Sequence, residues 1–169
     1  MERYCIRTAE PGDRQLLTDL KTAYVSSMYR GFIPQERLKE LDPTPYEANI
    51  ADFLAAPDRQ VLLCMEEDKP LGYLAVGDDP ENPGCGIIFD AAYVPDADDT
   101  ARDALIVAAA ERFAAQGKQH VYIWLLRDNF RARFHFEQFN FKTEGTLRTH
   151  VVEGREAQLI RYVYRIPSL

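Results

Sequence analysis

Residues Gly86–Gln116 read GIIFDAAYVPDADDTARDALIVAAAERFAAQ, and this stretch decides the fold. Its first part is mostly apolar, which predicts a buried strand over Ile87–Val94. A short acidic loop, Pro95–Asp99, then leads into a predicted helix over Thr100–Gln116, where apolar residues recur at helical spacing. Gly117 follows and predicts the end of that helix.

A strand that runs straight into a helix is a natural anion site, because the first helical N–H groups are unpaired and point at the loop. The loop here contains no glycine and carries Asp96, Asp98 and Asp99. Thr100 and Asp103 stand three residues apart, as a capping pair would. In an alternative interpretation, Asp98 and Asp99 cap the helix themselves, which would remove the anion site.

Composition limits the classes of function that this chain can have. Its 169 residues predict one domain, and a formal net charge of −7 disfavours nucleic acid and anionic membranes as partners. No apolar run is long enough to span a bilayer and the N-terminus resembles no signal peptide, so we expect a cytoplasmic protein. Cys5 and Cys64 fall in predicted strands and are expected to be buried, reduced thiols. The spacing of cysteines and histidines predicts no metal site.

The rest of the chain predicts a mixed sheet. Before the central strand and helix, the patterns indicate a strand (Arg3–Thr8), a helix (Gly12–Tyr29), a short helix from Pro34, a helix opened by a capping box at Thr44–Glu47, and a hairpin of the strands Gln60–Glu66 and Leu71–Gly77. The central strand and helix are Ile87–Val94 and Thr100–Gln116. After them come a buried strand (His120–Leu126), a helix (Asn129–Phe139) capped by Asp128 and closed by Asn140, and two final strands (Phe141–Val152 and Glu156–Ile166). The strand–helix–strand crossover places Ile87–Val94 and His120–Leu126 parallel. A three-layer α/β/α fold on a mixed sheet is the simplest architecture.

Two local motifs point to a family. The tripeptide Tyr93-Val94-Pro95 is similar to a tripeptide in that family, at the end of the strand whose backbone pairs with the pantetheine arm of the cofactor. A second motif follows with its usual spacing, in Asn129, Ala132, Glu137 and Phe141. With the order of elements, these residues resemble the GNAT family of N-acetyltransferases over nearly the whole chain. The resemblance implies an acyl-CoA N-acyltransferase fold.

The resemblance also implies an activity and a site. The implied activity is transfer of an acetyl group from acetyl-CoA to a primary amine of a small-molecule or peptide acceptor, with a homodimer as a further expectation. The residues that match positions of the cofactor site in the family are Tyr93, Val94, Thr100, Ala101, Arg102, Asn129 and Phe136. An acceptor pocket is expected at Tyr24, Tyr29 and Phe32, although helix-face residues of this kind also serve as core or rim.

The sequence departs from the family at two places. The family loop that wraps the CoA diphosphate contains glycines, whereas Asp96–Arg102 contains none and offers three carboxylates. Phe136 stands where many members have the tyrosine that protonates the leaving thiolate. His135 is adjacent but lies about 100° around a helix, so it is either a substitute acid or a structural side chain. Asp90 is either a general base or an ordinary solvated carboxylate.

Three hypotheses therefore remain open. The chain is an acetyl-CoA-dependent transferase with a diverged and weakened site, or a GNAT-fold binding or regulatory module that has lost CoA. The third hypothesis is an enzyme of the same fold that uses a different acyl donor.

Overall fold

The computed structural model describes residues 3–168, and their contacts divide the chain into two compact units. The first unit comprises the residues up to Gly77 together with Asp90–Ala109, and the second comprises Asp78–Phe89 and the residues from Ala110 onward. Strand β4 (Gly86–Tyr93) and helix α4 (Asp99–Ala115) contribute residues to both units. The order of elements is the predicted one, with a short 3-10 helix added at Pro11–Asp13.

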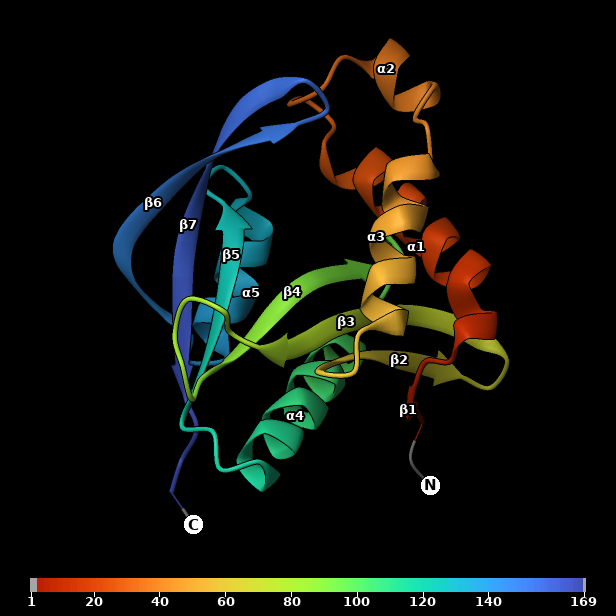
Figure 1. The fold of residues 1–169 in the computed structure, drawn as a ribbon. Coiled ribbons are helices and arrows are strands. Elements are labelled where there is room, and N and C mark those ends of the chain that lie inside the picture. The colour runs from red at the N-terminus through yellow and green to blue at the C-terminus, as the bar shows by residue number, and fades with distance from the viewer. Residues whose placement is uncertain (1–2, 169) are drawn as a thin grey trace. The chain divides into compact units, whose positions relative to one another are not determined.

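The first unit contains an antiparallel set of strands and most of the helices (Figure 1). Its strands pair in the order β1 (Cys5–Thr8), β2 (Arg59–Glu66) and β3 (Lys69–Asp78). Strand β3 is buried from Leu71 through Gly77, as expected for a strand covered on both faces. The helices are α1 (Arg14–Met28), α2 (Gln35–Lys39) and α3 (Thr44–Ala55), and α1 packs against α3.

The second unit is built around the C-terminal strands. It contains β5 (His120–Leu126), α5 (Phe130–Gln138), β6 (Lys142–Val152) and β7 (Arg155–Arg165). Strand β7 lies between β5 and β6 and is antiparallel to both, and β6 and β7 form the long curved hairpin drawn in blue in Figure 1. Strand β5 is parallel to β4, as predicted, over three residue pairs from Gly86↔Val121 to Ile88↔Ile123.

Strand β5 is less buried than the sequence predicts. Burial alternates along it, so only one of its two faces lies in the core. On the other face, Tyr122 and Trp124 are covered by guanidinium groups: Arg148 lies 4.3 Å from the centroid of the Trp124 ring and Arg161 lies 4.9 Å from that of Tyr122. Arginine stems and cation–π contacts therefore shield an apolar stretch that the sequence pattern assigns to the interior.

Three helix starts differ from the prediction. Thr44 does not cap α3, because it is the first residue of the helix and Pro43 precedes it. Asp42 Oδ1 accepts the Thr44 N–H at 3.0 Å, so the Asp42 carboxylate binds a backbone N–H at this helix start. Helix α5 is capped by Asn129 and not by Asp128, since the Asn129 side chain accepts the Ala132 N–H at 3.1 Å. Helix α4 begins at Asp99, one residue before the predicted start, and Asp98 caps it, as described below.

Local turn chemistry and thiol burial give a mixed outcome. Asn140 closes α5 at φ 68° and Gly117 follows α4 at φ 76°, both in the left-handed region as predicted. Cys64 is buried, as expected. Cys5 is exposed, contrary to expectation, because β1 is the outermost strand and is paired on one side only.

The predicted fold class is confirmed. The strands form one mixed sheet with the order β1-β2-β3-β4-β5-β7-β6, and helices flank it. Within residues 3–168, none of the helices combines the length and the apolarity that a membrane crossing requires.

Candidate functional site

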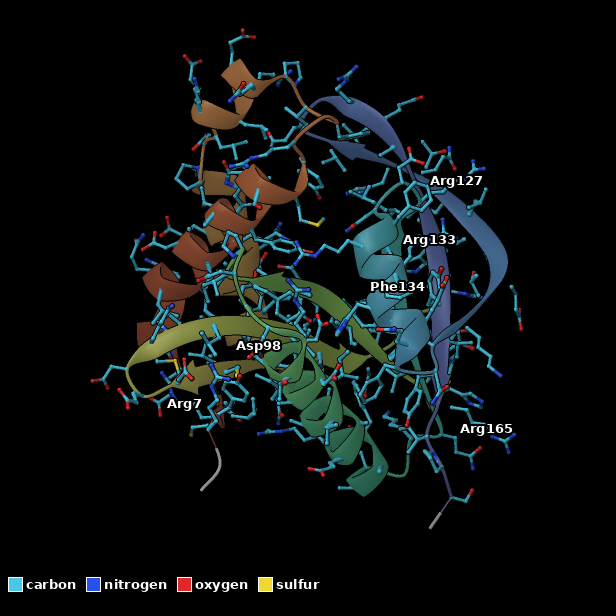
Figure 2. All side chains as sticks on the ribbon, turned by 180° about the vertical axis from the view of Figure 1, so that it is seen from behind. Arg7, Asp98, Arg127, Arg133, Phe134 and Arg165 are labelled. Atoms are coloured by element: carbon cyan, nitrogen blue, oxygen red, sulfur yellow. The ribbon has the colours of Figure 1, made fainter. Side chains whose placement is uncertain are left out.

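The N-terminus of α4 is closed by a side chain of the protein itself. Asp98 Oδ1 accepts the N–H of Ala101 at 3.0 Å, and Figure 2 labels Asp98 where the chain enters this helix. The carboxylate also accepts the Tyr4 hydroxyl at 2.8 and 2.9 Å and lies 3.2 Å from Arg3 Nη1. These contacts lower the pKa of Asp98, first through the Ala101 N–H and then through the Tyr4 hydroxyl. Asp98 therefore carries its charge at neutral pH and occupies the helix end that could otherwise hold an external anion.

Arg102 is buried against Tyr93 and also pairs with Asp99, with 3.5 Å between Nη1 and Oδ1. Its guanidinium lies 5.3 Å from the centroid of the Tyr93 ring, and its side chain is buried. Tyr93 in turn makes an edge-on contact with Tyr24 of α1, with ring centroids 6.1 Å apart. Gly72 permits this packing, because a Cβ at that position would lie 2.6 Å from the Tyr93 ring.

Asp90, a predicted catalytic residue, is engaged on both carboxylate oxygens. Oδ1 pairs with Lys21 Nζ at 2.5 Å, and Oδ2 accepts the Tyr73 hydroxyl at 2.7 Å. Burial is the largest single influence and would lower the pKa of Lys21, but the Asp90 charge and hydrogen bond, together with Tyr29 and Tyr24, outweigh it, so the pKa is raised. Asp90 is thus the acceptor in a half-buried ion pair and not an ordinary solvated carboxylate, and its role as a general base stays a prediction.

The polar cluster around Asp90 includes residues that the sequence analysis did not single out. Lys21 lies in α1 four residues after Leu17 and three before Tyr24, on the apolar side of that helix. A lysine in an apolar stripe next to a strand that carries an aspartate is a recognisable signal of a buried pair. Tyr73 lacks such a signal, because a tyrosine within a buried strand is ordinary core composition.

The other predicted catalytic residue, His135, is buried in the second unit. The His135 ring contacts the Phe136 ring edge-on, with ring centroids 5.6 Å apart. Phe136 packs against Phe141 with ring centroids 5.1 Å apart. Phe136 therefore provides core contacts where a tyrosine would present a hydroxyl. The structure supports the structural interpretation of His135 and leaves a catalytic role as a prediction.

The predicted cofactor residues fall into two groups. Tyr93, Val94, Thr100, Ala101 and Arg102 belong to the first unit, around the β4–α4 loop. The Val94 N–H donates to Leu71 O at 2.9 Å, so it extends the pairing between β4 and β3.

The second group, Asn129 and Phe136, belongs to the second unit. Asn129 uses its side chain as the α5 cap, and Phe136 is buried. Their roles toward a cofactor stay predictions.

The predicted acceptor residues are half-buried aromatics. Tyr29 and Phe32 pack together with ring centroids 6.0 Å apart, at the end of α1 and in the loop that follows. The centroid of the Tyr24 ring lies 5.7 Å from Lys21 Nζ, so Tyr24 borders the polar cluster around Asp90. Burial raises the pKa of Tyr24 to about 12. The acceptor pocket formed by these three residues stays a prediction.

Comparison with known proteins gives likeness in fold at low sequence identity. No protein-family model matches the sequence, and no curated protein matches it. Among solved structures, a GCN5-related N-acetyltransferase from Rhodopseudomonas palustris is 18% identical with a TM-score of 0.74, covering 98% of this chain and 97% of that one. The PaiA N-acetyltransferase of Thermoplasma acidophilum, in complex with coenzyme A, is 13% identical with a TM-score of 0.72, covering 97% and 100%.

A third match is the yncA protein of Salmonella typhimurium with its cofactor acetyl-CoA, at 15% identity and a TM-score of 0.68, covering 99% of this chain and 96% of that one. In each case nearly the whole length of both chains is aligned. From the strand order, the parallel β4–β5 pair and these matches, we conclude that this chain has the fold of the GNAT acetyltransferases.

Proposed function

We propose that this chain is a GNAT-fold binding module that has lost the cofactor site of the fold. The observation that carries the proposal is the cap on α4, where the Asp98 carboxylate takes the Ala101 N–H. A helix N-terminus attracts an anion through its unpaired N–H groups and its positive end. The Asp98 carboxylate takes one of these N–H groups and partly neutralises the positive helix end. Its own negative charge then repels a second anion.

The residues present at this helix end do not fit the diphosphate of coenzyme A. The resemblance calls for glycines whose backbone approaches the phosphates, and Asp96–Arg102 has none. Asp96, Asp98 and Asp99 are all exposed at this helix end. Arg102, the cation in the segment, is directed toward Tyr93 instead of the solvent side.

Isothermal calorimetry with coenzyme A tests the proposal. We expect the wild-type chain to show no saturable heat and no rise in melting temperature. The double variant Asp98→Gly, Asp99→Arg removes the cap, adds conformational freedom and replaces a negative charge with a positive one. This variant should gain measurable affinity.

The matched control is Glu36→Gln in α2, which removes one exposed carboxylate elsewhere in the first unit and should leave the heat at baseline. Saturable binding of coenzyme A to the wild type at micromolar concentrations would contradict the proposal. Failure of the double variant to gain affinity would show that the acidic loop is not the cause.

The second candidate function is a weakened transfer of acetyl groups from acetyl-CoA to a primary amine. The cofactors named with the PaiA and yncA structures favour it, since those chains align over nearly their whole length. In this candidate the acceptor is a small molecule or a peptide. Release of free thiol from acetyl-CoA, measured with a panel of primary amines, separates the two functions: turnover supports the transferase, and no turnover supports the binding module.

A further inference from the structure

Arg102 is a buried cation whose counter-charge is on the surface. Its side chain is 10% exposed, and Asp99, the carboxylate paired with it at 3.5 Å, is 78% exposed. Guanidinium groups cannot shed their proton in a protein, and burying one requires compensation by hydrogen bonds and opposite charge. A solvated carboxylate at this distance supplies only part of that compensation.

Two polar atoms in this region are buried and have no hydrogen-bond partner among residues 3–168. They are Arg102 Nε and the hydroxyl oxygen of Tyr93, on side chains that touch through the cation–π contact. Burial raises the pKa of Tyr93, so its hydroxyl keeps a proton to donate. Each of the two groups is a donor, and orphaned buried donors are rare in folded proteins.

The nearby ion pair does not supply the missing charge. Lys21 and Asp90 pair at 2.5 Å and neutralise each other, and the remaining Asp90 oxygen accepts the Tyr73 hydroxyl. Asp98 is already occupied by Tyr4, Arg3 and the Ala101 N–H. Asp90 and Asp98 are therefore both engaged by other groups, and the carboxylate that pairs with Arg102 is the exposed Asp99.

We propose that Arg102 and Tyr93 form a binding site for a small carboxylate anion. The Nε side of a guanidinium is one edge of its planar fork, and a carboxylate docks on such an edge with two parallel hydrogen bonds. The Tyr93 hydroxyl provides a further donor. A singly charged planar carboxylate fits better than a phosphate, because Asp99 and Asp103 already place negative charge near this arginine and tyrosine. The site concerns a ligand other than coenzyme A and does not rest on the proposed function.

Nuclear magnetic resonance of isotope-labelled arginine in the wild-type protein tests the proposal directly. Sodium acetate is titrated against sodium chloride at constant ionic strength. We expect the Arg102 Nε–H resonance to shift along a saturable curve with acetate alone, and the melting temperature to rise along the same curve. A resonance that follows acetate and chloride equally, or that does not move, would overturn the proposal.

Variants separate a binding role from a structural one. Tyr93→Phe keeps the ring contacts and should weaken acetate binding about tenfold, as expected for one hydrogen bond to a charged group. Arg102→Met should abolish binding. Asp99→Asn is the matched control: it removes the competing surface carboxylate, so acetate should bind as well as in the wild type or more tightly.

Two outcomes of the variant series contradict the site. Equal acetate affinity in Tyr93→Phe and the wild type would remove the tyrosine from it, and loss of binding in Asp99→Asn would show that the surface carboxylate holds the anion site together. A crystal grown in acetate that contains only an ordered water between Nε and the hydroxyl would overturn the proposal. Because coenzyme A is titrated separately, failure of this site and failure of the proposed function give different results.

Discussion

At the scale of single residues, several carboxylates in this chain serve as internal acceptors. Asp98 closes a helix, Asp90 binds a lysine and a tyrosine, and Asp42 takes a backbone N–H at the start of α3. A net charge of −7 therefore does not translate into a uniformly acidic binding surface. The sequence shows how many carboxylates there are, and the fold decides which of them remain available to a partner.

Asp13 provides a residue-scale prediction of pH dependence. It accepts two hydrogen bonds from Arg7 at 2.8 Å, and Oδ2 also accepts the Glu10 N–H at 2.7 Å. These bonds, with the arginine contributing most, lower the pKa of Asp13 from 3.8 to about 2. Because the folded-state pKa is the lower one, the stabilisation is complete above 3.8 and is lost as the pH falls toward about 2.

Replacing Asp13 with Asn should therefore lower the free energy of unfolding at neutral pH by about 1–2 kcal/mol, a value reduced for the partial exposure of Arg7. Near the folded-state pKa the difference from the wild type should shrink. Urea unfolding at the two pH values measures it, and Asp58→Asn on the exposed loop before β2 is the control. A loss of stability that is the same at both pH values would contradict the assigned ion pair.

At the scale of elements, hydrophobic period predicts which segments are helices and strands, and it fails at their ends. Helices α1 and α4 and strands β2 to β5 are assigned to the correct type, although β5 is buried on one face only. Caps depend on which of several neighbouring polar side chains reaches a given N–H. At α5 both Asp128 and Asn129 are acceptable cap residues, and only the path of the chain selects Asn129.

The packing of β3 against the end of β4 gives a prediction at this scale. A Cβ on Gly72 would lie 2.6 Å from the Tyr93 ring and 2.8 Å from the Ala92 carbonyl oxygen, and the backbone oxygen cannot move away without breaking strand pairing. Gly72→Ala should lower the free energy of unfolding by about 1–3 kcal/mol. Chemical denaturation measures the change.

Gly12 provides the matched control, because a Cβ there meets nothing within 4 Å and the residue needs no left-handed conformation. Gly12→Ala should change stability by less than about 0.5 kcal/mol. Equal effects of the two substitutions would mean that the contact at Gly72 is relieved without cost.

At the scale of the whole molecule, the fold is predictable from the order of elements and the candidate site is predictable only in part. The crossover rule fixes β4 and β5 as parallel neighbours. The sequence predicts the Asp98 cap as one of two alternatives for this helix end. The Lys21–Asp90–Tyr73 cluster is not predicted, because its members are separated by up to 69 residues and no local pattern joins them. Long-range polar pairing requires the tertiary structure.

The division into two units raises the question of whether they unfold together. Strand β4 and helix α4 each begin in one unit and end in the other, so opening either unit removes part of both elements. Partial loss of a strand and a helix is unfavourable for the part that remains. We therefore expect a single cooperative transition.

Two native probes test this expectation. Trp124, the chain's one tryptophan, reports on the second unit, and the buried thiol of Cys64 reports on the first. In a Cys5→Ser, Cys85→Ser variant, a short pulse of thiol reagent at each urea concentration labels only opened Cys64. Labelling and tryptophan fluorescence should give the same midpoint, and the fluorescence curve of the wild type controls for the serine substitutions. Labelling that precedes the fluorescence change would show that the first unit opens alone, and that the elements shared by the two units do not couple them.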